Sequence, residues 1–204
     1  MDDGGPRTPQ ERITAECASG GRAALIAGCV ALLDGRPDDV DDRLIALLGG
    51  NAAGHVLDGG EGGRSGYWPR VWAARGLLHA WDDRTAGADG DAGADGDAGA
   101  DAATAGADRP AEAYAGTAGA DRPAEADAVT AGADRPAEAD AVTAVIIGAL
   151  GDRAWRVREM AAKVVAAHRV GQALDAVAAI RDDPVPRVRV AAERAVVLLT
   201  AAQA

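Results

Sequence analysis

The sequence predicts an all-α fold, an α-solenoid of about three to four helical hairpins interrupted by a long disordered insertion. One pattern occurs twice, at Asp152 and at Asp183, 31 residues apart: an Asp, a Val-Arg pair five and six positions later, then small apolar residues at helical spacing. A period of about 20–50 residues is typical of solenoids, in which each unit buries its apolar face against its neighbours. No stretch alternates polar and apolar residues as a β-strand would.

The N-terminal region predicts three helices and a short helical segment. Residues 8–11, Thr-Pro-Gln-Glu, form a capping box with Pro at the first helical position, and Ser-Gly-Gly at 19–21 ends that helix. Apolar residues at helical spacing over 25–33 predict a second helix. Asp38 and Asp39 are predicted to open a third helix that closes at Gly49-Gly50, and residues 52–57 add one or two turns.

The C-terminal region predicts helix, turn and helix in each unit. Asp152 and Asp183 are placed to accept hydrogen bonds from free N–H groups of the helices that follow them. Apolar residues then follow helical spacing over 157–168 and 188–199, with a shorter helix over 170–180 between them. A degenerate third copy begins at Pro69, with Val71 in place and Trp72 where the Arg is expected.

The repeated pattern, Asp-x-x-x-x-Val-Arg-x-x-Ala-Ala, resembles the second-helix signature of HEAT repeats, above all the short PBS-lyase-type HEAT-like subclass. The resemblance covers residues 143–204 and is weaker upstream. It implies that second helices line a concave face. It also implies a ladder of side chains that links adjacent repeats, formed by Asp152, Arg158, Asp183 and Arg189.

Residues 85–142 differ in composition from the rest of the chain. A six-residue Gly-Ala-Asp-Gly-Asp-Ala repeat is followed by a 13-residue repeat, and large apolar residues are almost absent. Such a composition cannot bury enough apolar surface to fold. Deleting it would leave a short connection from Arg84 to Thr143. We therefore expect one discontinuous domain, 1–84 with 143–204, and a mostly disordered insertion over 85–142.

The net charge of −11 comes almost entirely from this insertion, whose 13 acidic residues and 3 arginines leave the other 146 residues at −1. A nearly neutral domain lacks the basic surface that a duplex nucleic-acid binder needs. The chain shows neither a signal-peptide pattern nor an apolar run of about 18 residues. Cys17 and Cys29 lack metal-ligand spacing. We expect a cytoplasmic protein with free thiols, no metal, no cofactor and no membrane contact.

The segment 59–72 is the candidate binding site. Its glycines, aromatics and arginines precede a helix, where backbone N–H groups and arginines hold anions and rings stack on ligands. A stripe at helical spacing follows on that helix, and Trp155 and Arg156 begin the equivalent helix in the next unit. Packing of these aromatics against a repeat end is the alternative. The predicted binding residues are Arg64, Tyr67, Trp68, Arg70, Trp72, Arg75 and His79.

The sequence favours a non-catalytic scaffold or adaptor that binds a protein or peptide partner, because Trp and Arg are common at binding hot spots and no catalytic motif is present. The apolar stretch 188–199 also allows self-association. One alternative is an enzyme similar to HEAT-like bilin-chromophore lyases or alkyl-base DNA glycosylases, using Trp68, Trp72, Trp81 and Asp82. Another is an assembly element without a ligand site.

Overall fold

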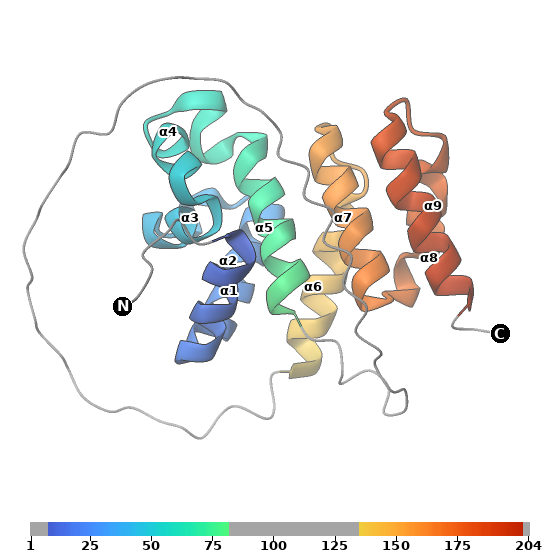
Figure 1. The fold of residues 1–204 in the computed structure, drawn as a ribbon, viewed down its shortest axis with the longest axis horizontal. Coiled ribbons are helices and arrows are strands. Elements are labelled where there is room, and N and C mark those ends of the chain that lie inside the picture. The colour runs from blue at the N-terminus through green and yellow to red at the C-terminus, as the bar shows by residue number, and fades with distance from the viewer. Residues whose placement is uncertain (1–7, 82–134, 202–204) are drawn as a thin grey trace, which may run out of the picture.

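The computed structural model describes residues 8–81 and 135–201, and all regular elements in these two ranges are helical (Figure 1). The prediction of an all-α fold is confirmed for this part of the chain. Most of the predicted disordered insertion, residues 85–134, lies outside the described residues.

The first helix starts at a capping box, as predicted. In α1 (Pro9–Glu16), Thr8 Oγ1 accepts a bond from Glu11 N at 3.2 Å, and Thr8 N donates to the Glu11 carboxylate at 2.6 Å. The predicted stop at 19–21 is instead a π-helical turn, Cys17–Gly21, that leads directly into α2 (Arg22–Leu33). Gly20 has a φ of 91°, which only glycine adopts at low cost, and so bends the chain there.

The third helix begins later than predicted. Asp38 and Asp39 lie in a 3₁₀ turn, Pro37–Asp39, and Val40 after it is extended. Asp41 is the cap of α3 (Asp42–Gly49), because its carboxylate accepts a bond from Leu44 N at 2.8 Å. The prediction of a helix start at Asp38 is therefore wrong.

The remaining elements follow the predicted order, with two changes of boundary. A 3₁₀ turn leads into α4 (Ala53–Leu57), a 3₁₀ segment covers Gly60–Ser65, and α5 (Tyr67–Ala80) begins two residues before Pro69. Helix α6 (Arg135–Ala149) begins well before the predicted boundary at Thr143, because Val142 and Ile146, one turn apart, are both fully buried. The other helices are α7 (Trp155–His168), α8 (Leu174–Ala179) and α9 (Pro186–Ala201).

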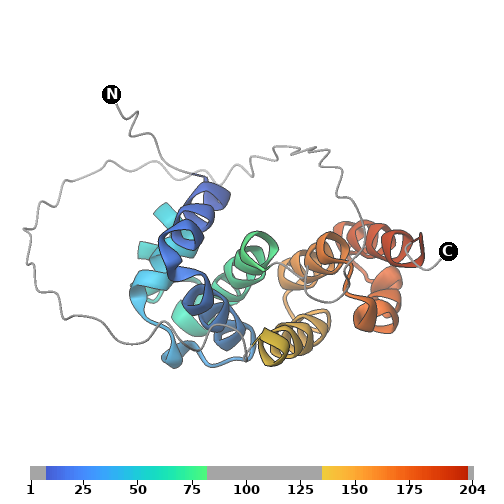
Figure 2. The same cartoon turned by 90° about the horizontal axis from the view of Figure 1, so that it is seen from below.

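The helices form two layers over most of the molecule. Helices α5, α7 and α9 lie side by side in one row, and α2, α6 and α8 form a second row against them (Figures 1 and 2). Helices α1, α3 and α4 extend the fold beside α5. The row of α5, α7 and α9 therefore joins the residues before 82 to those after 134.

A single hydrophobic cluster runs through both layers, from Ile13 to Leu199. It contains Trp72, which packs against Gly49 so closely that a Cβ there would lie 2.6 Å from the indole ring. The two described ranges thus share one core.

The helical stretch Pro9–Leu33 is the one part of the described residues that is long and apolar enough to cross a membrane, by length and composition. Its residues Leu25, Ile26 and Cys29 are buried in the shared core.

Candidate binding surface

Helices α5, α7 and α9 present equivalent residues at equivalent positions. Each helix has an arginine as its fourth residue, Arg70, Arg158 and Arg189 respectively. Pro69-Arg70 is therefore the counterpart of Val157-Arg158. The sequence alignment of Val71-Trp72 with that pair is wrong by two positions.

These arginines form a ladder across the row. Arg158 Nε and Nη2 donate to the two carboxylate oxygens of Asp183 at 2.7 and 3.0 Å. Arg70 Nε and Nη2 reach Asp152 in the same way at 2.8 and 3.4 Å. The hydrogen bond from Arg158 is the main cause that holds the pKa of Asp183 below its ordinary value. Arg70, predicted to bind a partner, thus ties α5 to the turn before α7.

The two aspartates shape turns and are not the caps themselves. Asp152 Oδ1 accepts a bond from Ala154 N at 2.7 Å, and Asp183 Oδ1 accepts one from Val185 N at 2.8 Å. The N-cap residue of α7 is Ala154, two positions after the Asp. Each carboxylate therefore folds the turn ahead of its helix and receives the arginine of the preceding unit.

Each ladder arginine is also held by its own loop. Arg158 Nη1 donates to the carbonyls of Asp152 and Arg153 at 2.7 and 3.1 Å. Arg189 Nη1 donates to Asp183 O and Pro184 O at 2.8 and 3.3 Å. Within the described residues no carboxylate pairs with Arg189, so the ladder stops at α9.

Arg64 holds the Gly-rich loop against α3. Arg64 lies three residues before α5, the same position that Asp152 has before α7 and Asp183 before α9. Its side chain pairs with Asp42 and with the carbonyls of Pro37 and Val40. The loop needs its glycines, because a Cβ at Gly66 would collide with a carbonyl oxygen of the loop. Arg64 is therefore occupied by the fold and is not open to an anion.

The predicted stripe on α5 lies largely inside the fold. Trp72 is only 4% exposed. Arg75 Nη2 donates to Leu48 O at 3.0 Å, beside Arg12, whose Nε donates to Leu47 O at 2.8 Å. Both guanidinium groups thus satisfy carbonyls at the end of α3, where cations are favoured.

Burial also shifts the pKa of two residues of this stripe. Burial lowers the pKa of Arg75, and the charge of Arg12 lowers it further. Among the residues that the structure describes, Arg75 Nε is buried without a hydrogen-bond partner. Burial is also the main cause of the lowered pKa of His79, followed by the charges of Arg75 and His168. A stripe that is open to a partner along its whole length is therefore not what the structure shows.

The surface that remains open lies at the starts of α5, α7 and α9. The Arg156 guanidinium carbon lies 4.4 Å from the Trp155 ring centroid, 5.4 Å from that of Trp68 and 5.9 Å from that of Tyr67. Arg187 lies 5.9 Å from the Trp155 centroid. We call these five residues the Arg–aromatic strip. They come from the first two positions of the three helices.

The strip combines fixed rings with exposed cations. Trp68 stacks on the buried Trp72, with ring centroids 6.3 Å apart, and this contact holds the Trp68 ring against the core. Arg156 and Arg187 are exposed, and Arg187 also pairs with Glu159 at 3.4 Å. Stacked guanidinium groups still offer N–H donors to carboxylates. Sequence reasoning identified Tyr67 and Trp68, but it missed Arg187.

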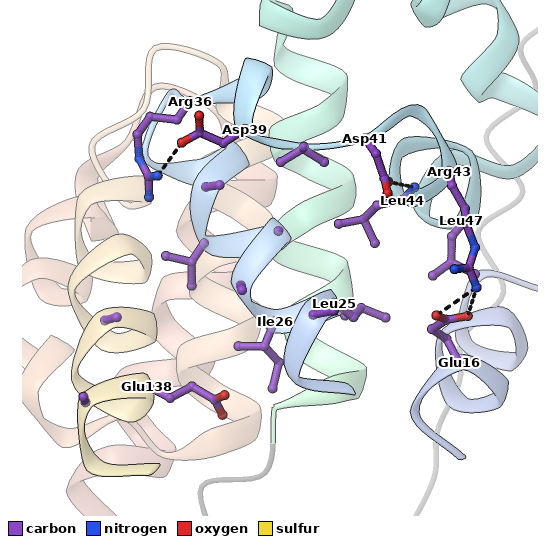
Figure 3. Close-up of a pocket in the computed structure, with 18 residues that line it drawn as sticks. Glu16, Leu25, Ile26, Arg36, Asp39, Asp41, Arg43, Leu44, Leu47 and Glu138 are labelled. Atoms are coloured by element: carbon purple, nitrogen blue, oxygen red, sulfur yellow. Dashed lines mark hydrogen bonds and ion pairs between the residues drawn. The ribbon is translucent and has the colours of Figure 1, made fainter. Parts of the chain in front are cut away.

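A groove of about 820 Å³ lies on the other layer, between α2, α3 and the start of α6 (Figure 3). Ion pairs stand at its rim, Arg43 with Glu16 at 3.2 Å and Arg36 with Asp39 at 2.6 Å. Glu138 of α6 completes one side. Sequence reasoning missed this groove, because its floor is made of small and aliphatic residues that look like ordinary core positions: Ala24, Leu25, Ala27, Gly28, Val30, Ala31, Leu44 and Leu47.

Most of the aromatic residues that the enzyme alternative would use are buried in the core. Trp72 and Trp81 are both buried, and Asp82 lies outside the described residues. Comparison of the chain with protein-family models, with curated proteins and with solved structures finds no match.

Proposed function

We propose that this protein is a non-catalytic α-solenoid of HEAT-like units that binds a protein or peptide partner through its Arg–aromatic strip. The observation that supports this proposal is the position of Arg156, exposed and shared among rings from two successive helices. A cation held over rings is preorganised, so less side-chain entropy is lost on binding.

The repeat arrangement supports the solenoid interpretation. Arg70 and Arg158 each tie one helix of the row to the turn before the next, so the same pair type occurs at two successive seams, with Asp152 and with Asp183. A row of this kind repeats equivalent surface positions, and solenoids use such surfaces to bind extended partners.

The chemistry of the strip suggests the class of partner. Its two arginines favour carboxylates, and its partly exposed rings favour apolar or aromatic side chains. A peptide segment with an acidic residue next to an aromatic or aliphatic one would satisfy both. We keep the cytoplasm as the proposed location, in keeping with the two free thiols of Cys17 and Cys29.

A peptide-display selection against the immobilised full chain tests this proposal. Enriched peptides would be synthesised with a fluorescent label and titrated by anisotropy. We expect acidic–aromatic peptides, and we expect the double variant Trp155→Ala, Arg156→Ala to weaken binding by at least about tenfold, because hot-spot residues contribute about 2 kcal/mol or more.

The matched control is Arg153→Ala, which removes an exposed arginine from the turn just before α7 and leaves the strip unchanged. It should bind the peptides as the unaltered chain does. Peptides that bind all three proteins equally would show that the strip is not the binding surface.

A further inference from the structure

Helix α9 exposes a face that its two counterparts in the row bury. Val190 and Val197, the fifth and twelfth residues of α9, are 71% and 57% exposed. The fifth residue of α5, Val71, is 6% exposed, and the twelfth residue of α7, Ala166, is 8% exposed. The fifth residue of α7, Glu159, is also buried, at 9% exposed. The fifth position is thus buried in both α5 and α7, and the twelfth is buried in α7, whereas both are open in α9.

This open face is also hollow and rimmed by charge. A depression of about 570 Å³ lies on it, and we call its lining residues the end face of α9. Exposed apolar residues that are rimmed by polar ones mark surfaces at which proteins interact. The end face consists of Arg181, Arg189, Val190, Glu193, Arg194, Val197 and Leu198.

Arg189 is held on this face as Arg158 is held in the ladder. Both donate Nη1 to two carbonyls of their own loop, five and six residues earlier. In Arg158, Nε and Nη2 then bind both oxygens of Asp183. The corresponding atoms of Arg189 make no hydrogen bond within the described residues. The guanidinium of Arg189 is therefore held in place by its loop, but within the described residues its Nε and Nη2 have no carboxylate to bind. At Arg70 and Arg158 the same two atoms bind Asp152 and Asp183.

The charges of the end face select an acidic occupant. It has three arginines against one acid, and Glu193 is already paired with Arg181 at 3.1 Å. A second copy docked face to face would bring Arg189 and Arg194 towards their own counterparts, which like-charge repulsion disfavours. A partner with a carboxylate complements the same face.

We propose that the end face of α9 docks a helical hairpin of another protein chain, whose turn supplies a carboxylate to Nε and Nη2 of Arg189. The partner thereby repeats the ladder step seen at Asp152 and Asp183 and covers Val190 and Val197. This surface is separate from the Arg–aromatic strip, so the two proposals stand or fall independently.

The probe is a labelled peptide with the sequence of residues 170–201, which presents Asp183 between two helical segments. Titrated against the full chain, it should bind saturably. The peptide carrying Asp183→Asn, and the full chain carrying Arg189→Ala, should each weaken binding by at least about tenfold, as for a charge-assisted bidentate pair. The full chain carrying Arg153→Ala should bind as the unaltered chain does.

A second variant tests the same contact within one chain and so does not depend on binding of a separate peptide. It repeats residues 170–201 once more after Ala201, and its unfolding is followed in urea. The added unit should raise the unfolding midpoint, and Arg189→Ala in the first copy should remove that gain.

Three results would overturn the proposal: no saturable peptide binding and no gain from the added unit, equal binding of the two peptides, or no effect of Arg189→Ala. Sedimentation of the full chain adds a fourth. A dimer that Val190→Asp dissociates would identify a second copy as the occupant instead.

Discussion

Arg158 and Arg189 occupy equivalent helix positions and donate to the equivalent two carbonyls of their own loops, but within the described ranges only Arg158 pairs with a carboxylate. The Arg158–Asp183 pair is largely removed from solvent, with side chains 14% and 5% exposed. Losing one partner of such a pair leaves the other charge buried and unpaired. Comparing the two arginines therefore separates two contributions: Arg158 has both the carboxylate and the loop carbonyls, whereas Arg189 has the loop carbonyls alone.

We expect Arg158→Ala to lower the free energy of unfolding by about 3 kcal/mol, because Asp183 remains buried without its partner. Arg189→Ala should cost less than about 1 kcal/mol, since it removes only two hydrogen bonds to carbonyls, one part-buried and one exposed, and leaves no buried charge without its partner. Urea unfolding of both variants measures the difference. Equal losses would show that the loop contacts, and not the carboxylate, stabilise the arginine.

The same comparison explains which site residues could be read from the sequence. Rings and arginines ahead of a helix are visible as residue types, and Tyr67 and Trp68 were proposed as binding residues on that ground. Whether a residue on that helix is open depends on what packs against it. The end of α3 covers Arg75 through Leu48 O, a contact between residues 27 apart that helical spacing cannot reveal.

At the scale of the elements, α2 and α5 approach each other through Gly76. A methyl group there would lie 2.6 Å from Cys29 Sγ and 2.9 Å from Leu48 Cδ2. Both neighbouring side chains are fully buried, so they have little room to move. The close contact of these two helices therefore requires glycine.

Gly76→Ala should lower the free energy of unfolding by about 1–3 kcal/mol, the usual cost of overpacking a core. Gly148→Ala, in α6, is the matched control, because among the described residues nothing outside its own stretch of helix lies within 4 Å of the added methyl group. That control should gain about 0.5 kcal/mol from helix propensity. Thermal and urea unfolding would measure both, and a neutral Gly76→Ala would contradict the close approach.

Helix boundaries were predictable where a local signal decides them. The capping box at Thr8 is such a case, because both hydrogen bonds lie within four residues. The start of α3 was not, because Val40 is extended and moves the cap from Asp38 to Asp41. The register of α5 was not predictable either. Arg70 is recognised as the ladder arginine of α5 only by its pair with Asp152, which lies 82 residues away in the sequence. Val71-Trp72 resembles the repeated Val-Arg pair more closely in sequence, and so gave the wrong register.

At the scale of the whole molecule, the two described ranges depend on one another. Helix α5 packs on α7, α2 packs on α6, and Arg70 pairs with Asp152 across the same boundary. The hydrophobic cluster continues through these contacts without a break. Cooperative unfolding of one body follows from such a shared core.

The Arg–aromatic strip depends on this arrangement. The Arg–aromatic strip exists only when α5 stands beside α7, since Arg156 of one helix lies over Tyr67 and Trp68 of the other. The central claim is therefore that residues 8–81 and 135–201 form one body held by the row of α5, α7 and α9.

Cutting the chain between the two ranges tests this claim most directly. A specific protease site inserted between Ala100 and Asp101 would allow cleavage of the folded protein, followed by size-exclusion chromatography and urea unfolding. We predict that the two fragments elute together and unfold in one transition, and that Arg70→Ala weakens their association. Fragments that separate under native conditions, or that unfold in two independent transitions, would contradict the account.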